Sequence, residues 1–161
     1  MSELVIREAS PDDIDAMYDI ELKCFSDPWT RAMLDPFCGY TGARAAVAEL
    51  DGKICGFVFI YVVAGDTGEN NGEVDLADIA VDPDARRTGV AKKLISYVYD
   101  SARKNNCGNI FLEVRRSNTA ARALYESEGF AVIGERKKYY TSPVEDAVIM
   151  KKELAAVAAS E

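Results

Sequence analysis

The run Arg86–Ala91 places two arginines and a glycine at the start of a helical pattern of apolar residues. An apolar, strand-like segment, Ile79–Val81, comes shortly before it. The first backbone N–H groups of such a helix have no carbonyl partner, and the helix dipole adds partial positive charge at the same point. Gly89 lets a ligand approach the backbone closely because it has no side chain. The arrangement predicts a binding site for a phosphorylated cofactor.

The same segment lacks two common phosphate-binding motifs. It is not a Walker loop, because no glycine lies at the required distance before a Gly-Lys-Ser/Thr sequence. The spaced glycines of a Rossmann fingerprint are also missing. The alternative is an ordinary helix start that carries four solvated cations, Arg86, Arg87, Lys92 and Lys93.

The chain as a whole is acidic, with a formal net charge of −8. Residues 1–50 hold ten acidic and four basic side chains, whereas basic residues cluster at 86–93 and 136–138. Because phosphate neutralisation dominates nucleic-acid binding, this balance disfavours a direct nucleic-acid partner. The N-terminus lacks the features of a signal peptide, and no apolar run is long enough to span a bilayer. We therefore expect a cytoplasmic location and no membrane partner.

The absence of histidine limits the acid–base chemistry that the chain can perform. Ser-His and Cys-His nucleophilic mechanisms are excluded, so a general base must be Glu, Asp, Tyr, Lys or a terminal amine. The cysteines form no CxxC pair, which favours reduced, buried thiols over a metal site. These cysteines are Cys24, Cys38, Cys55 and Cys107.

Two residues in the second half of the chain are candidates for proton transfer. Glu113 interrupts the apolar run Ile110–Val114, although an exposed strand carboxylate paired with a neighbouring arginine, Arg115 or Arg116, is the alternative. Tyr125 lies in a predicted helix whose first turn Asn118 caps, where a core aromatic is the alternative. The residue pattern alone leaves both alternatives open.

Hydrophobic periodicity predicts one α/β domain, residues 1–154, followed by a flexible tail, residues 155–161. The sheet is expected to be mixed, antiparallel at its start, with a parallel pair around the helix at 89–104. A turn is expected at 106–109. Strands are expected at residues 3–8, 43–50, 53–63, 73–81, 110–115, 130–140 and 144–154, and helices at 10–25, 31–37, 89–104 and 118–128.

Several motifs, in the same order along the chain, resemble those of the GNAT N-acetyltransferase superfamily. The resemblance covers nearly the whole chain and is strongest to the ribosomal-protein alanine N-acetyltransferases and related N-terminal acetyltransferases. It implies the single-domain GNAT fold, with about seven strands and about four helices. The matching segments are Asp27–Thr30, Ile79–Pro83, Arg86–Lys92, Leu112–Arg115, Ser117–Asn118, Ala123–Ser127, Gly129–Phe130 and Tyr139–Tyr140.

The resemblance also implies the ligands and the roles of the site residues. Acetyl-CoA would be the cosubstrate, with no metal, and a protein N-terminal α-amine would attack its thioester directly. Glu113 would be the base, Tyr125 the acid for the departing thiolate, and a strand amide near Val81 would stabilise the oxyanion. The residues implied in cofactor binding are Ile79, Ala80, Val81, Arg86, Arg87, Thr88, Gly89, Val90, Ala91, Lys92 and Asn118.

The acceptor is less well defined by the sequence. The resemblance places Trp29, Tyr139 and Tyr140 beside the incoming peptide, and a packing role is the alternative for Trp29. An α-amine with a pKa of about 8 is roughly 20% neutral near pH 7.4, whereas a lysine at about 10.4 is only ~0.1% neutral. Glu113 can therefore deprotonate an α-amine more easily than a lysine.

Two other functions remain as alternatives: acetylation of lysine or a small-molecule amine, and non-catalytic binding of an acyl-CoA. The acceptor could be a ribosomal protein or a wider set of N-termini. A monomer or weak dimer is expected.

Overall fold

The computed structural model describes residues 3–35 and 42–155. The strands are β1 (Leu4–Glu8), β2 (Ala43–Leu50), β3 (Lys53–Val63), β4 (Gly72–Val81), β5 (Cys107–Arg115), β6 (Ala131–Thr141) and β7 (Val144–Glu153). The helices are α1 (Ile14–Cys24), α2 (Arg31–Leu34), α3 (Val90–Lys104) and α4 (Thr119–Ser127), and the short 3-10 turns are η1 (Pro11–Asp13) and η3 (Pro83–Ala85).

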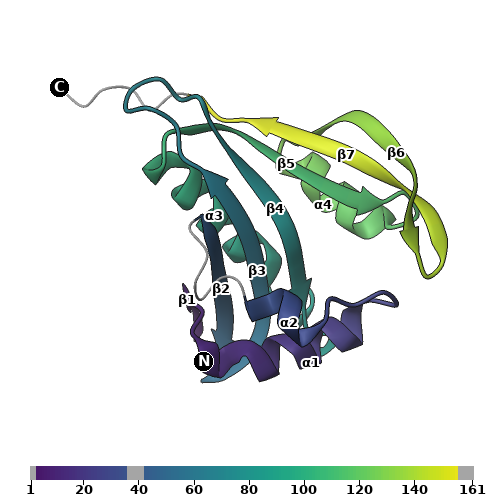
Figure 1. Ribbon diagram of the computed structural model, residues 1–161. Helices are drawn as coiled ribbons and strands as arrows, with labels where there is room; N and C mark the ends of the chain where they lie inside the picture. Colours follow the sequence, from purple (N-terminus) through teal and green to yellow (C-terminus); the bar gives the residue numbers. More distant parts are fainter. Residues whose placement is uncertain (1–2, 36–41, 156–161) are drawn as a thin grey trace.

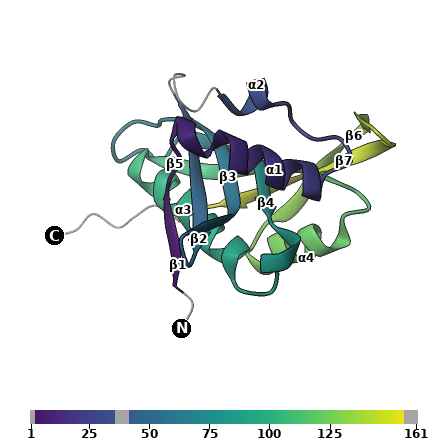
Figure 2. The ribbon, with the colours of Figure 1, turned by 90° about the horizontal axis from the view of Figure 1, so that it is seen from below.

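The strands form one sheet in the order β1-β2-β3-β4-β5-β7-β6. Only β4 and β5 pair in parallel, and every other pair among the described strands is antiparallel. Helices α1 and α2 lie over one face of the sheet, and α3 and α4 over the other (Figure 2). The predicted mixed sheet of about seven strands with about four helices is therefore confirmed.

The start of β5 differs from the sequence-based expectation. We expected a turn at residues 106–109, but the strand already begins at Cys107. Cys107 pairs with Gly72 of β4, and Asn109 pairs with Glu153 of β7. Hydrogen bonding to a strand on each side outweighs the turn preference of glycine and asparagine in this segment. The turn is confined to Asn105 and Asn106.

Parts of two other predictions lie outside the described residues. The helix expected at residues 31–37 begins at Arg31 and ends at Leu34, and residues 36–41, which include Cys38, are not described. The expected tail is likewise outside the description from residue 156 onward. None of the described helices combines the length and the apolar character that crossing a membrane requires.

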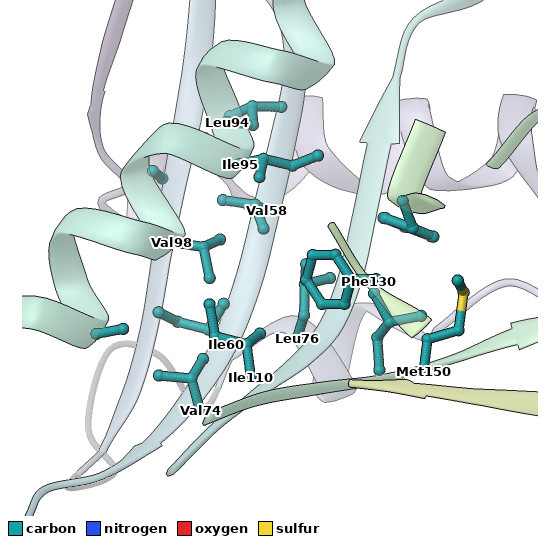
Figure 3. Packing of buried hydrophobic residues seen from close by; sticks show 14 of the residues in the cluster. Val58, Ile60, Val74, Leu76, Leu94, Ile95, Val98, Ile110, Phe130 and Met150 are labelled. Carbon is teal, nitrogen blue, oxygen red and sulfur yellow. The ribbon is translucent and has the colours of Figure 1, made fainter. Parts of the chain in front are cut away.

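Helix α3 connects the two parallel strands and packs its apolar face on the sheet. Its residues Leu94, Ile95 and Val98 are completely buried. Figure 3 shows these side chains against apolar residues of β3, β4 and β5. Burial of this face fixes where α3 begins, because the first turn of the helix is continuous with the packed turns that follow.

The pairing of β4 with β5 stops halfway along both strands. Its last pair is Leu76 with Leu112, although β4 continues to Val81 and β5 to Arg115. A β-bulge lies at the same point, because Phe59 of β3 pairs with Asp78 and Ile60 with Leu76, which leaves Ala77 without a partner on β3. Beyond the bulge the two strands diverge (Figure 1). We call the space between them the β4–β5 gap. On the β4 side, the backbone edge of residues 77–81 has no pairing with β5.

Truncation of Leu94 tests the role of α3 in holding these strands. Leu94→Ala is expected to lower the free energy of unfolding by about 2–5 kcal/mol, because it leaves a cavity in a fully buried site. Ser96→Ala, an exposed position on the same helix, should change it by less than about 0.5 kcal/mol. Chemical denaturation measures both, and equal effects of the two variants would contradict the packing argument.

Candidate active site

A cavity of about 550 Å³ opens at the β4–β5 gap. The end of β4, the first turn of α3, the end of β5 and the helix α4 all contribute to its wall. Nearly all the residues that the sequence predicted for the site line it. These are Trp29, Ile79, Ala80, Val81, Arg86, Arg87, Gly89, Val90, Ala91, Lys92, Glu113, Asn118, Tyr125 and Tyr140.

Thr88 and Tyr139 are the two predicted site residues that do not line this cavity. The hydroxyl of Thr88 donates to the carbonyl oxygen of Ala85, so its side chain secures the turn that leads into α3. Tyr139 lines a second cavity next to the first. The role expected for Thr88, a backbone amide that binds the pyrophosphate, stays a prediction.

The first turn of α3 presents free backbone donors to the cavity. Its N-cap, Gly89, has φ of +83° and no side chain to bond the helix amides. A Cβ atom placed on Gly89 would meet no atom within 4 Å, so the space in front of the backbone is open. Arg87 also has a positive φ, of 66°. The positive φ values at Arg87 and Gly89 thus turn the backbone so that its N–H groups are exposed. An anion-binding helix start requires such exposed donors.

Helix α4, which contains Tyr125 and has Asn118 as its N-cap, lies on the other side of the gap. Asn118 caps the helix by accepting a hydrogen bond from the backbone N–H of Ala121 at 3.2 Å, as the sequence predicted. Tyr125 is 6% exposed, and its ring packs edge-on against Phe130 at 5.7 Å. No hydrogen bond to a described residue occupies its hydroxyl group. Burial raises the pKa of Tyr125, and the nearby charge of Asp78 raises it further. The phenol therefore stays protonated and free to donate.

Glu113 lies on β5, on the face turned toward α2. Its carboxylate accepts a hydrogen bond from Nε of Arg136 at 2.8 Å, and the side chain is 27% exposed. The pairing considered from the sequence, with Arg115 or Arg116, is not formed, and the partner of Glu113 is Arg136 of β6. The neighbouring arginines have other partners: Arg115 pairs with Glu145 and Arg116 with Glu135.

A second cavity, of about 560 Å³, lies on the α2 side of the gap. It shares Trp29, Glu113 and Tyr140 with the first cavity, so the two spaces meet at these residues. Tyr139 and Tyr140 pack edge to face at 5.1 Å, and a hydrogen bond with Glu113 raises the pKa of Tyr139. Trp29 packs against Phe59 at 5.3 Å, so its ring has a structural contact as well.

The tip of the β6–β7 hairpin closes over the end of α1. The hydroxyl of Ser26 donates to the carbonyl oxygen of Ser142 at 2.7 Å. Arg115 lies 3.9 Å from Asp27 and stacks 4.4 Å from the ring centre of Tyr140. Burial raises the pKa of Tyr140 to about 12. The second cavity is therefore bounded by an aromatic wall that is tied to the segment after α1.

Sequence reasoning missed two carboxyl groups of the site, Glu21 of α1 and Asp78 of β4, which both line the first cavity. Glu21 is 1% exposed, and its Oε2 accepts the backbone N–H of Trp29 at 2.7 Å. Burial raises the pKa of Asp78 well above its usual range, and the adjacent Glu21 carboxyl adds to the effect. The signal that singled out Glu113, a carboxylate that interrupts an apolar strand, is also present at Asp78.

The cysteines agree only in part with the expectation of buried thiols. Cys55 and Cys107 are buried, but Cys24 is half-buried and lines the first cavity. Its Sγ lies 3.3 Å from the carbonyl oxygen of Val81. Cys24 is the last residue of α1, beside the end of β4, and the cavity leaves its side chain partly open.

Comparison with known proteins agrees with this architecture. The Acetyltransferase (GNAT) family matches residues 14–130. The ribosomal protein bS18-alanine N-acetyltransferase of Escherichia coli is 37% identical over 142 residues, which cover 86% of this chain and 89% of the relative.

Two solved structures extend the comparison. The crystal structure of the Escherichia coli ribosomal-protein-S18-alanine N-acetyltransferase superposes with a TM-score of 0.84 at 32% identity, over 99% of both chains. Arabidopsis thaliana NAA60 in complex with acetyl-CoA shares the fold, with a TM-score of 0.82 at 19% identity over 94% of this chain and 99% of that one. The chain belongs to the GNAT acetyltransferase family and is an N-acetyltransferase.

Proposed function

We propose that this enzyme transfers the acetyl group of acetyl-CoA to the N-terminal α-amine of a protein. The observation that carries the proposal is the β4–β5 gap, which has Tyr125 on one side, Glu113 on the other, and a second cavity beyond. The 37% identical relative is named for acetylation of ribosomal protein bS18 at alanine, which supports an acceptor of the same class. A ribosomal protein is one such acceptor.

The unpaired edge of β4 supports the assignment of the cosubstrate. Amide groups of an extended ligand can pair with the backbone of residues 77–81 as an additional strand would. The free amides at the start of α3, with Arg86, Arg87 and Lys92 in the cavity wall, suit the two phosphates of the pyrophosphate. The thioester would then lie near the bulge, between Tyr125 and Glu113.

The proposed mechanism is direct attack of the neutral amine on the thioester carbon. Glu113 accepts a proton from the amine, and Tyr125 donates its hydroxyl proton to the sulfur as the C–S bond breaks. A backbone N–H near Val81 stabilises the oxyanion. Trp29, Tyr139 and Tyr140 flank the first residues of the acceptor, and their aromatic surfaces and hydroxyl groups suit a peptide backbone.

We further propose that residues 1–154 carry the activity and that the tail, residues 155–161, is dispensable for it. The enzyme would act in the cytoplasm as a monomer or weak dimer, without direct contact with nucleic acid.

The choice of acceptor is tested with three peptides of one sequence. The first has a free N-terminus and no lysine, the second a blocked N-terminus and no lysine, and the third a blocked N-terminus and one lysine. We expect CoA release with the first peptide alone, because its amine is the easiest to deprotonate. Equal turnover of the third peptide would show a lysine acetyltransferase. Tight acetyl-CoA binding without turnover of any amine would show a binding module.

Substitution of the two proton-transfer residues tests the mechanism. Glu113→Gln and Tyr125→Phe are each expected to lower kcat about a hundredfold or more, because each removes one proton transfer and preserves the shape of the side chain. The Kd for acetyl-CoA, measured by calorimetry, should change by less than about twofold in both. Loss of cofactor binding in either variant would assign that residue a structural role. An acetylated cysteine trapped during turnover would contradict direct attack.

The phosphate site is tested at Gly89. Gly89→Ala places a methyl group where the ligand approaches and strains a backbone with φ of +83° by about 1–2 kcal/mol. We expect acetyl-CoA to bind at least about tenfold more weakly, since roughly 1.4 kcal/mol lost at the site has that effect. Gly68→Ala is the matched control, because Gly68 has φ of +81° and equally open space. Equal acetyl-CoA affinity in the two variants would show that the pyrophosphate does not bind at this loop.

A further inference from the structure

Glu21 and Asp78 form a buried carboxyl pair that the proposed mechanism does not use. Glu21 Oε1 and Asp78 Oδ2 are both buried, and neither has a hydrogen-bond donor within the described part of the chain. Burial raises the pKa of Asp78, and the adjacent Glu21 carboxyl raises it further. Two carboxyl groups in contact favour a state in which they share one proton. The two oxygens thus satisfy each other only when the pair holds that proton.

The position of the pair relates it to the acceptor. Asp78 follows the bulge of β4 and lines the same cavity as Glu113, which lies opposite on β5. Glu21 holds the backbone N–H of Trp29, so it also fixes the segment between α1 and α2 that borders the second cavity. An amine that enters from the second cavity toward the thioester therefore meets carboxyl groups on both strands.

The reaction itself calls for two proton acceptors. An α-amine arrives mainly as an ammonium, which must lose one proton before it can attack. The nitrogen loses a second proton after the C–N bond has formed, when it is positively charged in the tetrahedral intermediate. Glu113 can hold one of these protons. A group that removes the first works best when its own proton affinity is close to that of the amine.

We propose that Asp78, supported by Glu21, is a catalytic residue that takes the first proton from the acceptor ammonium. At rest the pair holds one proton, which leaves to solvent when the ammonium binds beside it. The N–H bond then breaks, and the proton of the amine joins the Asp78 carboxylate and is shared with Glu21. The neutral amine attacks, the C–S bond breaks, and the thiolate takes the proton of Tyr125. Glu113 receives the second amine proton and returns it through water to Tyr125. The pair ends the cycle with one proton, as it began, so the one proton released per turnover is the one displaced when the ammonium binds.

The surroundings of Asp78 agree with this role. Glu21 of α1 and Tyr125 of α4 are the titratable groups that interact with it. Glu113, Arg115 and Tyr140 line the same cavity. The cations that line this cavity are Arg115, which is held by Glu145 at 3.3 Å, and the group Arg86, Arg87 and Lys92 at the start of α3, where the diphosphate would be bound. A substrate ammonium therefore faces little competition from the protein's own cations for the Asp78 carboxylate.

The inference rests on the proposed function, and its test uses the peptide with a free N-terminus. Asp78→Asn should lower kcat/KM for the peptide at least tenfold at pH 7. The deficit should shrink as the pH rises past about 8, because the amine then arrives already neutral. Glu21→Gln keeps an oxygen for the Trp29 amide but removes the charge beside Asp78, so the acid limb of its profile should move to lower pH. Glu73→Gln, an exposed carboxyl on the same strand, should match the wild type.

Stability gives a readout that does not depend on turnover. A carboxyl whose pKa is higher in the folded than in the unfolded state binds its proton more tightly when folded, so it destabilises the fold at a pH above both values. Asp78→Asn should therefore raise Tm at pH 8, and the gain should disappear as the pH falls to about 4. A protonated-carboxyl infrared band present at pH 7 in the wild type should be missing from this variant.

The possible outcomes separate this inference from the proposed function. If the wild type acetylates the peptide and Asp78→Asn matches it at every pH, or is impaired equally at every pH, the inference is wrong and the proposed function stands. If the wild type acetylates no free N-terminus, the proposed function fails, while the infrared band still reports on the shared proton. Should Asp78→Asn fail to fold, Asp78→Ser carries the same expectations.

Discussion

The loss of pairing between β4 and β5 is the constraint on which the site depends. Two parallel strands that are paired as far as Leu76 and Leu112 hold the sheet together, and their separation beyond that point creates the cavity. The bulge at Ala77 turns the next residues of β4, so that the strand remains paired with β3 while its other edge becomes free. An unpaired edge inside a protein must find hydrogen-bond partners, and here a ligand can supply them.

Two helices begin beside this gap and bring different chemistry to it. Helix α3 begins at a glycine and offers backbone donors without a side-chain cap. Helix α4 begins at Asn118, whose side chain already caps the first turn, and its contribution is Tyr125. The two N-termini are therefore not equivalent: one is open for an anion, whereas the other fixes a buried phenol. The core under α3 holds both in place, because Leu94 and Tyr125 belong to one apolar cluster.

The sequence was sufficient for what depends on local pattern. Periodicity and turn residues located each strand and α-helix of the described residues, and the unusual Glu113 and the helix start at Gly89 pointed to the site. The start of β5 was predicted wrongly because it depends on pairing with two distant strands, which is not a local property of the sequence. The Glu21–Asp78 pair was missed because it joins α1 to β4 at the bulge. No spacing within either segment reveals that contact.

The charges of the site are divided between the two faces of the sheet. Cations lie around the start of α3, where a diphosphate would be bound, while Glu21, Asp78 and Glu113 lie toward the α1–α2 side. In an acidic chain, a basic cluster of this kind attracts an anionic ligand to one place, and the carboxyl groups attract an ammonium to the other. Among the described residues no ion pair joins Arg86, Arg87 or Lys92 to these carboxyl groups, so the two sets do not neutralise each other. Each reactant is thus guided to its own side of the gap, and the two meet at the bulge.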